Sequence, residues 1–262
     1  MRRFRMFIDD TGEVDNAATN QPERRFASIT GVIFDLDYYH ATFDASFRKV
    51  KFGQFGDTSK GRPPILHRRA LIDASGAFVC LQNPDTRKAW DDRCLDMYSR
   101  AEYHVITTSV DKVAFYYHHP AWNGEIYSML VQNAIERYWY FLRSHDGVGD
   151  VMAESIGKPD LALKARYSAA FDKGTEHISA DKIQHRLTSR EIKIKPKSDD
   201  ISGLQMADLL AKSSFDHCRC LYAKGDKQAG FSAKVSAVLE AQKYYRDENG
   251  NPHGYGRVWR PK

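Results

Sequence analysis

The chain has 262 residues, of which 42% are hydrophobic and 28% are charged, and its formal net charge is +5. These values are ordinary for a globular protein with a substantial core, and they exclude disordered and fibrous classes. No apolar run approaches the roughly 18 residues of a membrane-spanning helix, and the Arg-rich start lacks the apolar stretch of a signal peptide. We therefore expect a cytoplasmic protein without membrane contact.

The first part of the chain predicts two strands, a helix and a loop. Residues 4–8 and 26–34 are rich in aromatic and β-branched side chains, which favours strands. Residues 38–51 have a helical apolar rhythm. Residues 53–64 are rich in Gly, Pro, Ser and Asp, so a loop is expected there, as an insertion or lid.

The rest of the chain alternates predicted strands and helices. In order, we expect a strand over 103–110, a helix over 126–141 closed by Asp146 and Gly147, a strand around Val151, a helix opened by Pro159 and stopped by Gly174, a strand over 191–195, a helix containing Asp208, a helix around 235–242, and a turn-rich tail at 249–251.

This pattern predicts an α/β fold, with a mixed sheet and helices on both of its faces. The whole chain, 1–262, is expected to form one domain, with the loop-rich insertion around 53–64 and a helical C-terminal extension from about residue 225. Cys80, Cys94, Cys218 and Cys220 lack the spacing of a zinc site, and free thiols are expected.

Asp208 is the most informative residue, because it borders the apolar stripe of its predicted helix. A charge placed there needs a cation, a basic side chain or a proton shared with another acid. The stripe is formed by Leu204, Ala207, Ala211, Phe215, Cys218 and Tyr222.

Two further acids follow apolar segments. Asp9 and Asp10 end the first predicted strand, and Glu154 ends the apolar run at 151–153. Acids from three separate elements are what a Mg²⁺ or Mn²⁺ site requires, since these hard cations take oxygen ligands. The alternatives are a buried ion pair for Asp208 and a helix cap for Glu154.

Five segments together resemble the bacterial domain-of-unknown-function 3800 family, which is regarded as ribonuclease-H-like. They cover nearly the whole chain in order, and the run Gly-Leu-Gln-x-Ala-Asp-Leu-Leu-Ala is the most specific of them. The segments are residues 7–12, 65–69, 110–112, 152–160 and 203–211.

The resemblance implies a ribonuclease-H-like fold and an acidic centre of Asp9, Glu154 and Asp208. Asp10, Asp111 and Asp160 are the outer candidates. The family usually reads Asp-Glu-Ser-Gly at the first strand, whereas this chain has Asp10 and Thr11 in the middle positions. The second acid therefore has a shorter reach.

The resulting hypothesis is a nuclease that hydrolyses phosphodiester bonds of RNA or DNA with Mg²⁺ or Mn²⁺ held by Asp9, Glu154, Asp208 and Asp10. His67, beside Arg68 and Arg69, is a candidate to shuttle a proton or hold a phosphate, with a structural hydrogen bond as the alternative. The spread of basic residues is compatible with a nucleic acid as partner, with ordinary solvated lysines and arginines as the alternative. The sequence does not decide whether the substrate is RNA or DNA. It also leaves open whether the protein forms a homo-oligomer or binds another protein.

Two other functions fit parts of the sequence. Residues 31–37, with Asp35 and Asp37, resemble the nucleophile strand of haloacid-dehalogenase-type phosphatases, with Thr107 or Thr108, residues 157–159 and the pair Asp199 and Asp200 as later motifs. Tyr38 and Tyr39 stand where that family has a small turn. The third reading is a binding module that uses aromatic side chains at 116–119 and 139–140 without cutting. Simpler roles for Asp111 and Asp200 are a strand-end turn and a helix cap.

Overall fold

A computed structural model describes residues 1–17, 21–58, 61–223 and 227–261. Its centre is a six-stranded mixed sheet with the strand order β5-β4-β1-β2-β3-β6. The first three strands form an antiparallel meander, while β4 pairs parallel with β1, β5 with β4, and β6 with β3. The strands are β1 (Arg2–Gly12), β2 (Phe26–Asp35), β3 (His104–Asp111), β4 (Gly147–Glu154), β5 (Lys193–Lys195) and β6 (Arg257–Arg260).

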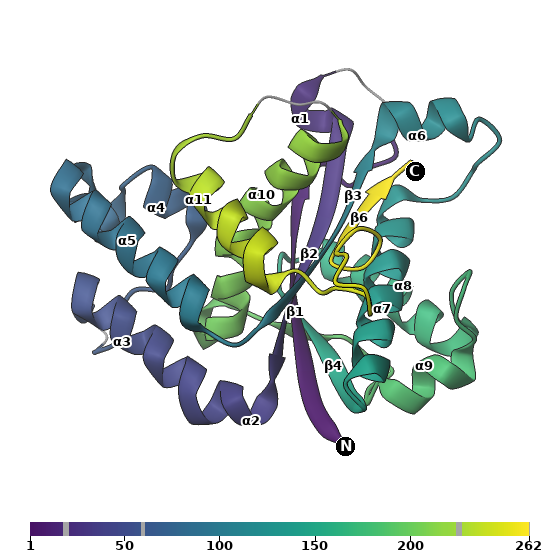
Figure 1. The fold of residues 1–262 in the computed structure, drawn as a ribbon, viewed down its shortest axis with the longest axis horizontal. Helices are drawn as coiled ribbons and strands as arrows, with labels where there is room; N and C mark the ends of the chain where they lie inside the picture. Colours follow the sequence, from purple (N-terminus) through teal and green to yellow (C-terminus); the bar gives the residue numbers. More distant parts are fainter. Residues whose placement is uncertain (18–20, 59–60, 224–226, 262) are drawn as a thin grey trace.

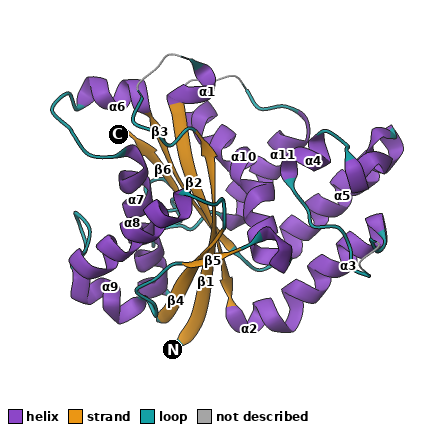
Figure 2. Ribbon diagram, turned by 180° about the vertical axis from the view of Figure 1, so that it is seen from behind, coloured by secondary structure: helices purple, strands orange, loops and turns teal. Residues whose placement is uncertain are grey.

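Helices cover both faces of this sheet (Figures 1 and 2). On one face lie α2 (Leu36–Tyr38), η1 (Tyr39–Phe43), α3 (Asp44–Phe55), α4 (Arg68–Ile72), η2 (Gly76–Gln82), α5 (Pro84–Arg100), α10 (Ser202–Tyr222), α11 (Gly230–Val238) and η4 (Leu239–Lys243). On the other lie α6 (Lys112–His118), α7 (Ile126–Ser144), α8 (Pro159–Lys173) and α9 (Ala180–Arg186). Two short elements, α1 (Pro22–Arg25) and η3 (Lys197–Asp199), connect strands to their neighbours.

The predicted α/β class and mixed sheet are confirmed, and most predicted elements are present. Strand β1 is longer than expected, and β5 is shorter, because only its last three residues pair with β4. Gly147 begins β4, so it is wrong as a helix-closing turn. The turns expected at 249–251 are present, but the chain then continues into β6, which pairs with β3 and was not predicted. Among the described residues, no helix is long and apolar enough to cross a membrane.

The loop expected at 53–64 begins later, because α3 continues to Phe55. Residues 59 and 60 of that segment lie outside the described ranges, as do 224–226 at the start of the expected C-terminal extension. The extension itself is joined to the main body. Helix α11 packs against α10 and α5, and β6 lengthens the central sheet.

Helix α10 sits directly on β1 at a glycine. A Cβ atom on Gly203 would lie 2.5 Å from two ring carbons of Phe7, far inside contact distance. The Gly203 N–H also donates to the Tyr39 hydroxyl at 3.1 Å. A glycine here therefore lets the first turn of α10 approach β1 closely enough to place Asp208 over the sheet.

We expect Gly203→Ala to lower the free energy of unfolding by about 1 to 3 kcal/mol, because the new methyl group overpacks the contact with Phe7. Gly53→Ala in α3 is the matched control, since its Cβ would meet nothing within 4 Å. That change should be neutral or slightly stabilising. Urea unfolding of both variants measures the difference, and equal stabilities would contradict the close contact.

Candidate active site

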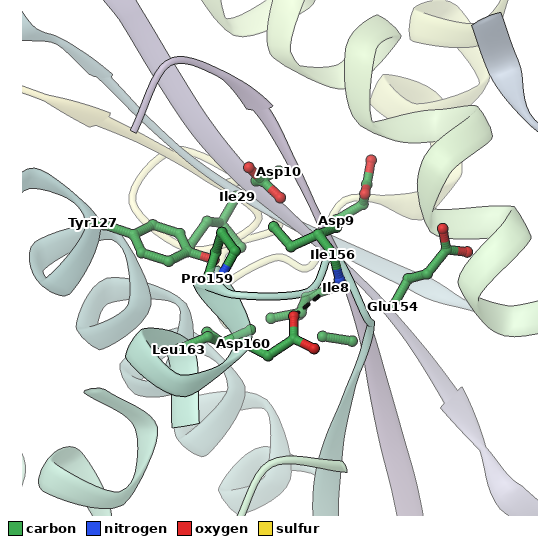
Figure 3. Close-up of a pocket in the computed structure, with 11 residues that line it drawn as sticks. Ile8, Asp9, Asp10, Ile29, Tyr127, Glu154, Ile156, Pro159, Asp160 and Leu163 are labelled. Carbon is green, nitrogen blue, oxygen red and sulfur yellow. Dashed lines mark hydrogen bonds between the residues drawn. The ribbon is translucent and has the colours of Figure 1, made fainter. Parts of the chain in front are cut away.

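Strand β1 and the end of β4 bring two acids to neighbouring positions. The parallel register pairs Phe7 with Met152 and Ile8 with Ala153, so Asp9 and Glu154 come next on adjacent strands. Phe7 and Met152 belong to the core cluster beneath α10, and side chains two positions apart share a face. Asp9 and Glu154 therefore face α10, and Figure 3 shows their carboxylates on the same side of the strands.

Asp208 on α10 is the third acid of this group. The pKa of Asp9 is raised well above its usual value, first by burial and then by the charges of Asp208, Asp10 and Glu154. No basic side chain of the described residues forms a salt bridge with Asp9. The charges of Asp208, Asp10 and Glu154 thus all act on Asp9, which places Asp9 at the centre of the acidic group.

Asp150 lies on the same face of β4 as Glu154, and its charge is compensated by basic side chains. Arg5 donates to it at 2.5 and 3.0 Å, and Lys193 donates at 2.6 Å. Burial raises the pKa of Asp150, but the two cations outweigh that effect and the pKa is lowered overall. Asp9 lies four residues after Arg5 on the same strand and has no basic partner of this kind in the described chain. Its negative charge is therefore not compensated by a nearby cation.

The raised pKa of Asp9 predicts how stability changes with pH. Asp9 contributes stability that is fully present below the ordinary carboxyl pKa, near 3.9, and that is lost as pH rises through the raised folded-state pKa. In a chelating buffer, Asp9→Asn should therefore be more stable than the wild type at pH 7, with the difference shrinking towards pH 4. Urea unfolding across this range measures it. The exposed Asp37→Asn variant is the control, and a pH-independent difference for Asp9→Asn would refute the assignment.

Asp208 also holds the segment that carries His67. The backbone N–H of Arg68 donates to Asp208 Oδ2 at 2.6 Å, and that of Leu66 donates to Gln205 Oε1 at 2.8 Å. His67 Nε2 lies 4.0 Å from Asp208 Oδ1, and the His67 side chain is 44% exposed. The residues of the Gly-Leu-Gln-x-Ala-Asp run thus position both an acid and a solvent-facing imidazole.

Glu154 does not cap the helix that follows it. Helix α8 begins after Lys158 without a side-chain cap, and Asp160 instead accepts from Ser155 Oγ at 2.6 Å and the Ile156 N–H at 2.9 Å. The partner of Glu154 is Lys197, whose Nζ lies 3.5 Å from Oε1. Both side chains are part-exposed, so this pair is open to exchange.

Asp10 lies beside Asp9 but on the other face of β1. It follows Asp9 directly, so its side chain points to the opposite face of β1, towards Tyr127 (Figure 3). Burial raises the pKa of Asp10. It lines a small pocket with Ile29, Tyr127 and Leu163, and Asp9 and Glu154 border the same pocket.

The remaining acids have structural partners. Asp111 forms a two-point pair with Arg25 at 2.9 and 2.5 Å and caps α6, so its charge is compensated and it is wrong as a simple turn residue. Asp200 does not cap α10, because it is paired with Lys51 at 2.6 Å. Asp35 pairs with Phe4 in the register, at the other end of the sheet from Asp9. It accepts from the N–H groups of Asp37 and Tyr38 and pairs with Arg2.

Three residues near the acids were not singled out from the sequence. Lys197 pairs with Glu154, and Tyr127 borders Asp10. The half-buried guanidinium of Arg68 has its pKa lowered by burial, which the charges of Asp216, Asp208 and Asp9 oppose. Arg68 could have been assigned to the site from the sequence, because it is adjacent to His67. Lys197 and Tyr127 reach the site through tertiary contacts, which no local sequence pattern reveals.

In the described parts of the chain, no three acidic, histidine or cysteine side chains stand close enough together to form a complete metal-ligand set. The carboxylates of Asp9, Glu154 and Asp208 share a face without converging on one point. No protein-family model and no curated protein sequence matches this chain.

Proposed function

We propose that this protein is a metal-dependent nuclease of ribonuclease-H-like architecture, which hydrolyses phosphodiester bonds at Asp9, Glu154 and Asp208. The observation that carries the proposal is the state of Asp9. It is a half-buried carboxylate with like charges around it and no salt bridge to a basic residue in the described chain. Such a group is strongly unfavourable unless it binds a proton or a cation.

The sheet supports the architecture. An antiparallel meander of β1, β2 and β3, with β4 parallel to β1 on its other side, places the end of β1 at the middle of the sheet. A late helix, α10, then crosses β1 and β2. This is the arrangement in which a first-strand Asp, a central Glu and a late-helix Asp would meet in a ribonuclease-H-like protein.

The donor set fits Mg²⁺ or Mn²⁺ in its chemistry, since all three candidates offer carboxylate oxygens and hard cations take such ligands. It requires movement, because the three side chains do not form a closed ligand set and Glu154 is paired with Lys197. Rotation of part-exposed side chains is an inexpensive change. When bound, the ion would supply activation of water and neutralisation of charge on the phosphodiester.

The chain's own residues have separate parts in this proposal. Asp9, Glu154 and Asp208 hold the ion. The guanidinium of Arg68 and the ammonium of Lys197 lie beside the acids and attract the phosphate, the first with a forked hydrogen-bonding geometry. His67 faces solvent next to Asp208, where its imidazole can carry a proton to or from the reacting phosphate.

The test combines metal binding with cleavage of a mixed panel of single-stranded and double-stranded RNA and DNA. Mn²⁺ should bind the wild type, as measured by calorimetry, and Mn²⁺ should be needed for cleavage. Binding of nucleic acid without turnover would support a non-catalytic module instead. Hydrolysis of a phosphate monoester that is lost in Asp35→Asn would support the phosphatase reading, and no metal binding would end the nuclease proposal.

A further inference from the structure

Two cavities adjoin at the C-terminal end of α7. The larger, of about 520 Å³, opens between α7, the start of β3 and the segment that follows η4. The smaller, of about 330 Å³, opens between α7 and α9. Arg143 lines both of them, and none of Asp9, Glu154 and Asp208 lines either. Both volumes fall within the range of about 300 to 1,000 Å³ that is usual for small-molecule sites.

Arg143 is a cation that aromatic rings hold in place. Its guanidinium carbon lies 5.1 Å from the ring centroid of Trp139, which lines the smaller cavity, and 5.3 Å from that of Tyr140, which lines the larger. In the described chain, the Arg143 side chain forms no salt bridge and donates no hydrogen bond. Its five N–H donors are therefore open to a ligand, and their forked geometry suits a phosphate.

The smaller cavity carries more positive than negative charge. Arg143, Lys182 and Arg186 line it, and Asp181 is the one carboxylate in the lining among the described residues. Arg186 is paired with Asp146 at 3.2 Å, whereas Lys182 is exposed and has no salt bridge to any residue that the structure describes. Even with Asp146 included, three cations stand against two carboxylates. Arg143 and Lys182 are thus the two charges left to attract an anion.

The larger cavity is lined by aromatic rings. The part-exposed Tyr255 lies with its ring centroid 5.7 Å from that of Tyr245 and 6.3 Å from that of Tyr140. Rings of this kind hold nucleobases, and each base that stacks on an aromatic side chain gains about 1 to 3 kcal/mol. The tyrosines of this cavity therefore suit the flat, partly apolar body of a base.

Polar groups that could meet the edge of a base lie beside these rings. Burial lowers the pKa of His104 to about 4, so its ring is neutral at pH 7 and offers one donor and one acceptor. His145 Nδ1 donates to the Phe141 carbonyl at 2.9 Å, which leaves Nε2 for a ligand. The side-chain amides of Gln242 and Asn249 make no hydrogen bond within the described chain.

The charged groups of the larger cavity are engaged by the chain or stand in solvent. Arg246 donates to the Gly250 carbonyl at 2.7 Å, and Asp247 accepts from the Asn251 N–H at 2.8 Å. Glu248 is exposed. This cavity thus suits a neutral polar ring, while the smaller one suits an anion.

We propose that the two cavities together bind one nucleotide, with its base against Tyr255 and Tyr140 and its phosphate at Arg143 and Lys182. Because Arg143 lines both cavities, a base and a phosphate joined by one sugar can occupy them at once. Arg186 donates to the carbonyl of Gly147, so the site lies near the start of β4. Glu154 is seven residues further along that strand, or about 23 Å away. The proposal is therefore independent of the nuclease function.

The test measures binding of adenosine 5′-monophosphate by calorimetry in a chelating buffer, which removes metal ions. The nucleotide should bind with a dissociation constant below about 1 mM. Adenosine and inorganic phosphate should each bind at least about tenfold more weakly, because each fills only one of the cavities. Arg143→Gln should weaken nucleotide binding by at least about tenfold. Arg100→Gln, the same change at an exposed arginine outside both cavities, should bind as the wild type does.

Two further variants keep the proposal testable should Arg143→Gln fail to fold. Lys182→Gln changes an exposed side chain and should weaken binding of the nucleotide but not of adenosine. Tyr255→Leu removes a ring and should weaken binding of both severalfold. Absence of nucleotide binding, equal affinity for adenosine, full affinity in a folded Arg143→Gln variant, or loss of binding in Asp208→Asn would each overturn the proposal.

A single strand of five adenylates distinguishes the two sources of such a nucleotide. If the strand displaces adenosine 5′-monophosphate, the site holds one unit of a nucleic acid. If the mononucleotide binds and the strand does not displace it, the site is specific for free nucleotides. Cleavage by the acidic group is measured separately with Mn²⁺, so either proposal can fail while the other stands.

Discussion

Asp9→Asn and Asp208→Asn should each lower the rate of Mn²⁺-dependent cleavage by at least about 100-fold. Each change removes a carboxylate oxygen from the proposed metal site while keeping nearly the same shape, and even residues that only orient metal ligands are worth about 10- to 100-fold. The loss should be accompanied by weaker Mn²⁺ binding in calorimetry. In Asp9→Asn the loss of activity should occur without loss of stability, because the wild-type carboxylate is half-buried among like charges.

The controls come from acids that the structure places elsewhere. Asp10→Asn changes the residue next to Asp9 but on the opposite face of β1, and Asp35→Asn changes an acid at the other end of the sheet. Both should keep cleavage within about threefold of the wild type, an effect of under 1 kcal/mol. If Asp10→Asn lost as much activity as Asp9→Asn, then the metal would sit on the Tyr127 side of the strand.

Lys197→Ala tests whether the ion pair of Glu154 with Lys197 competes with metal binding by Glu154. The ion pair of Lys197 with Glu154 competes with a metal for that carboxylate, whereas a phosphate would gain from the ammonium. We expect Lys197→Ala to tighten Mn²⁺ binding slightly in the absence of nucleic acid and to weaken binding of the nucleic acid. Weaker Mn²⁺ binding in this variant would mean that Lys197 supports the metal site rather than competing with it.

Helix α10 could be read from the sequence, because its apolar repeat is long and regular. The expected stripe is buried in the structure from Leu204 to Cys218, and Asp208 stands at its border as predicted. Asp9 and Glu154 could be located because each directly follows the apolar run of its strand. Strand ends and helix faces are local properties, so local patterns find them.

What could not be predicted depends on pairing between distant segments. The sequence gives no register for β1 and β4, and this register decides that Asp9 faces α10 while Asp10 faces Tyr127. Strand β6 is four residues long, and only its pairing with β3 makes it a strand. The partner of Asp200 was missed for the same reason, since Lys51 is far away in the chain.

That missed pair connects the core to the candidate active site. Lys51 Nζ donates to Asp200 Oδ1 at 2.6 Å and to Gln205 Oε1 at 3.1 Å, and Gln205 Nε2 donates to the same Asp200 oxygen at 2.8 Å. Gln205 Oε1 also accepts the Leu66 N–H. Lys51 and Asp200 are 1% and 2% exposed. The segment that carries His67 is therefore anchored to a buried charge network one helical turn from Asp208.

Asp200→Asn should lower the free energy of unfolding by about 3 to 5 kcal/mol, because it leaves the Lys51 ammonium buried without a counter-charge. The substitution suits the backbone, since residue 200 has φ of 52° and asparagine tolerates this region. The loss can then be assigned to charge and not to strain. Urea unfolding measures it, and hydrogen exchange at the Leu66 and Arg68 amides should accelerate if the network holds the His67 segment in place.

Two comparisons decide whether the buried charge is the cause. Arg48 also approaches Asp200, at 3.4 Å, but its side chain is 43% exposed, so Arg48→Ala should cost no more than about 1 kcal/mol. Adding Lys51→Met to Asp200→Asn removes the uncompensated ammonium and should restore much of the lost stability, since buried ion pairs are often replaceable by apolar groups. If stability does not recover, the ion pair is not the main cause. The hydrogen bonds of Asp200 and Gln205 would then hold α10 and the His67 segment together.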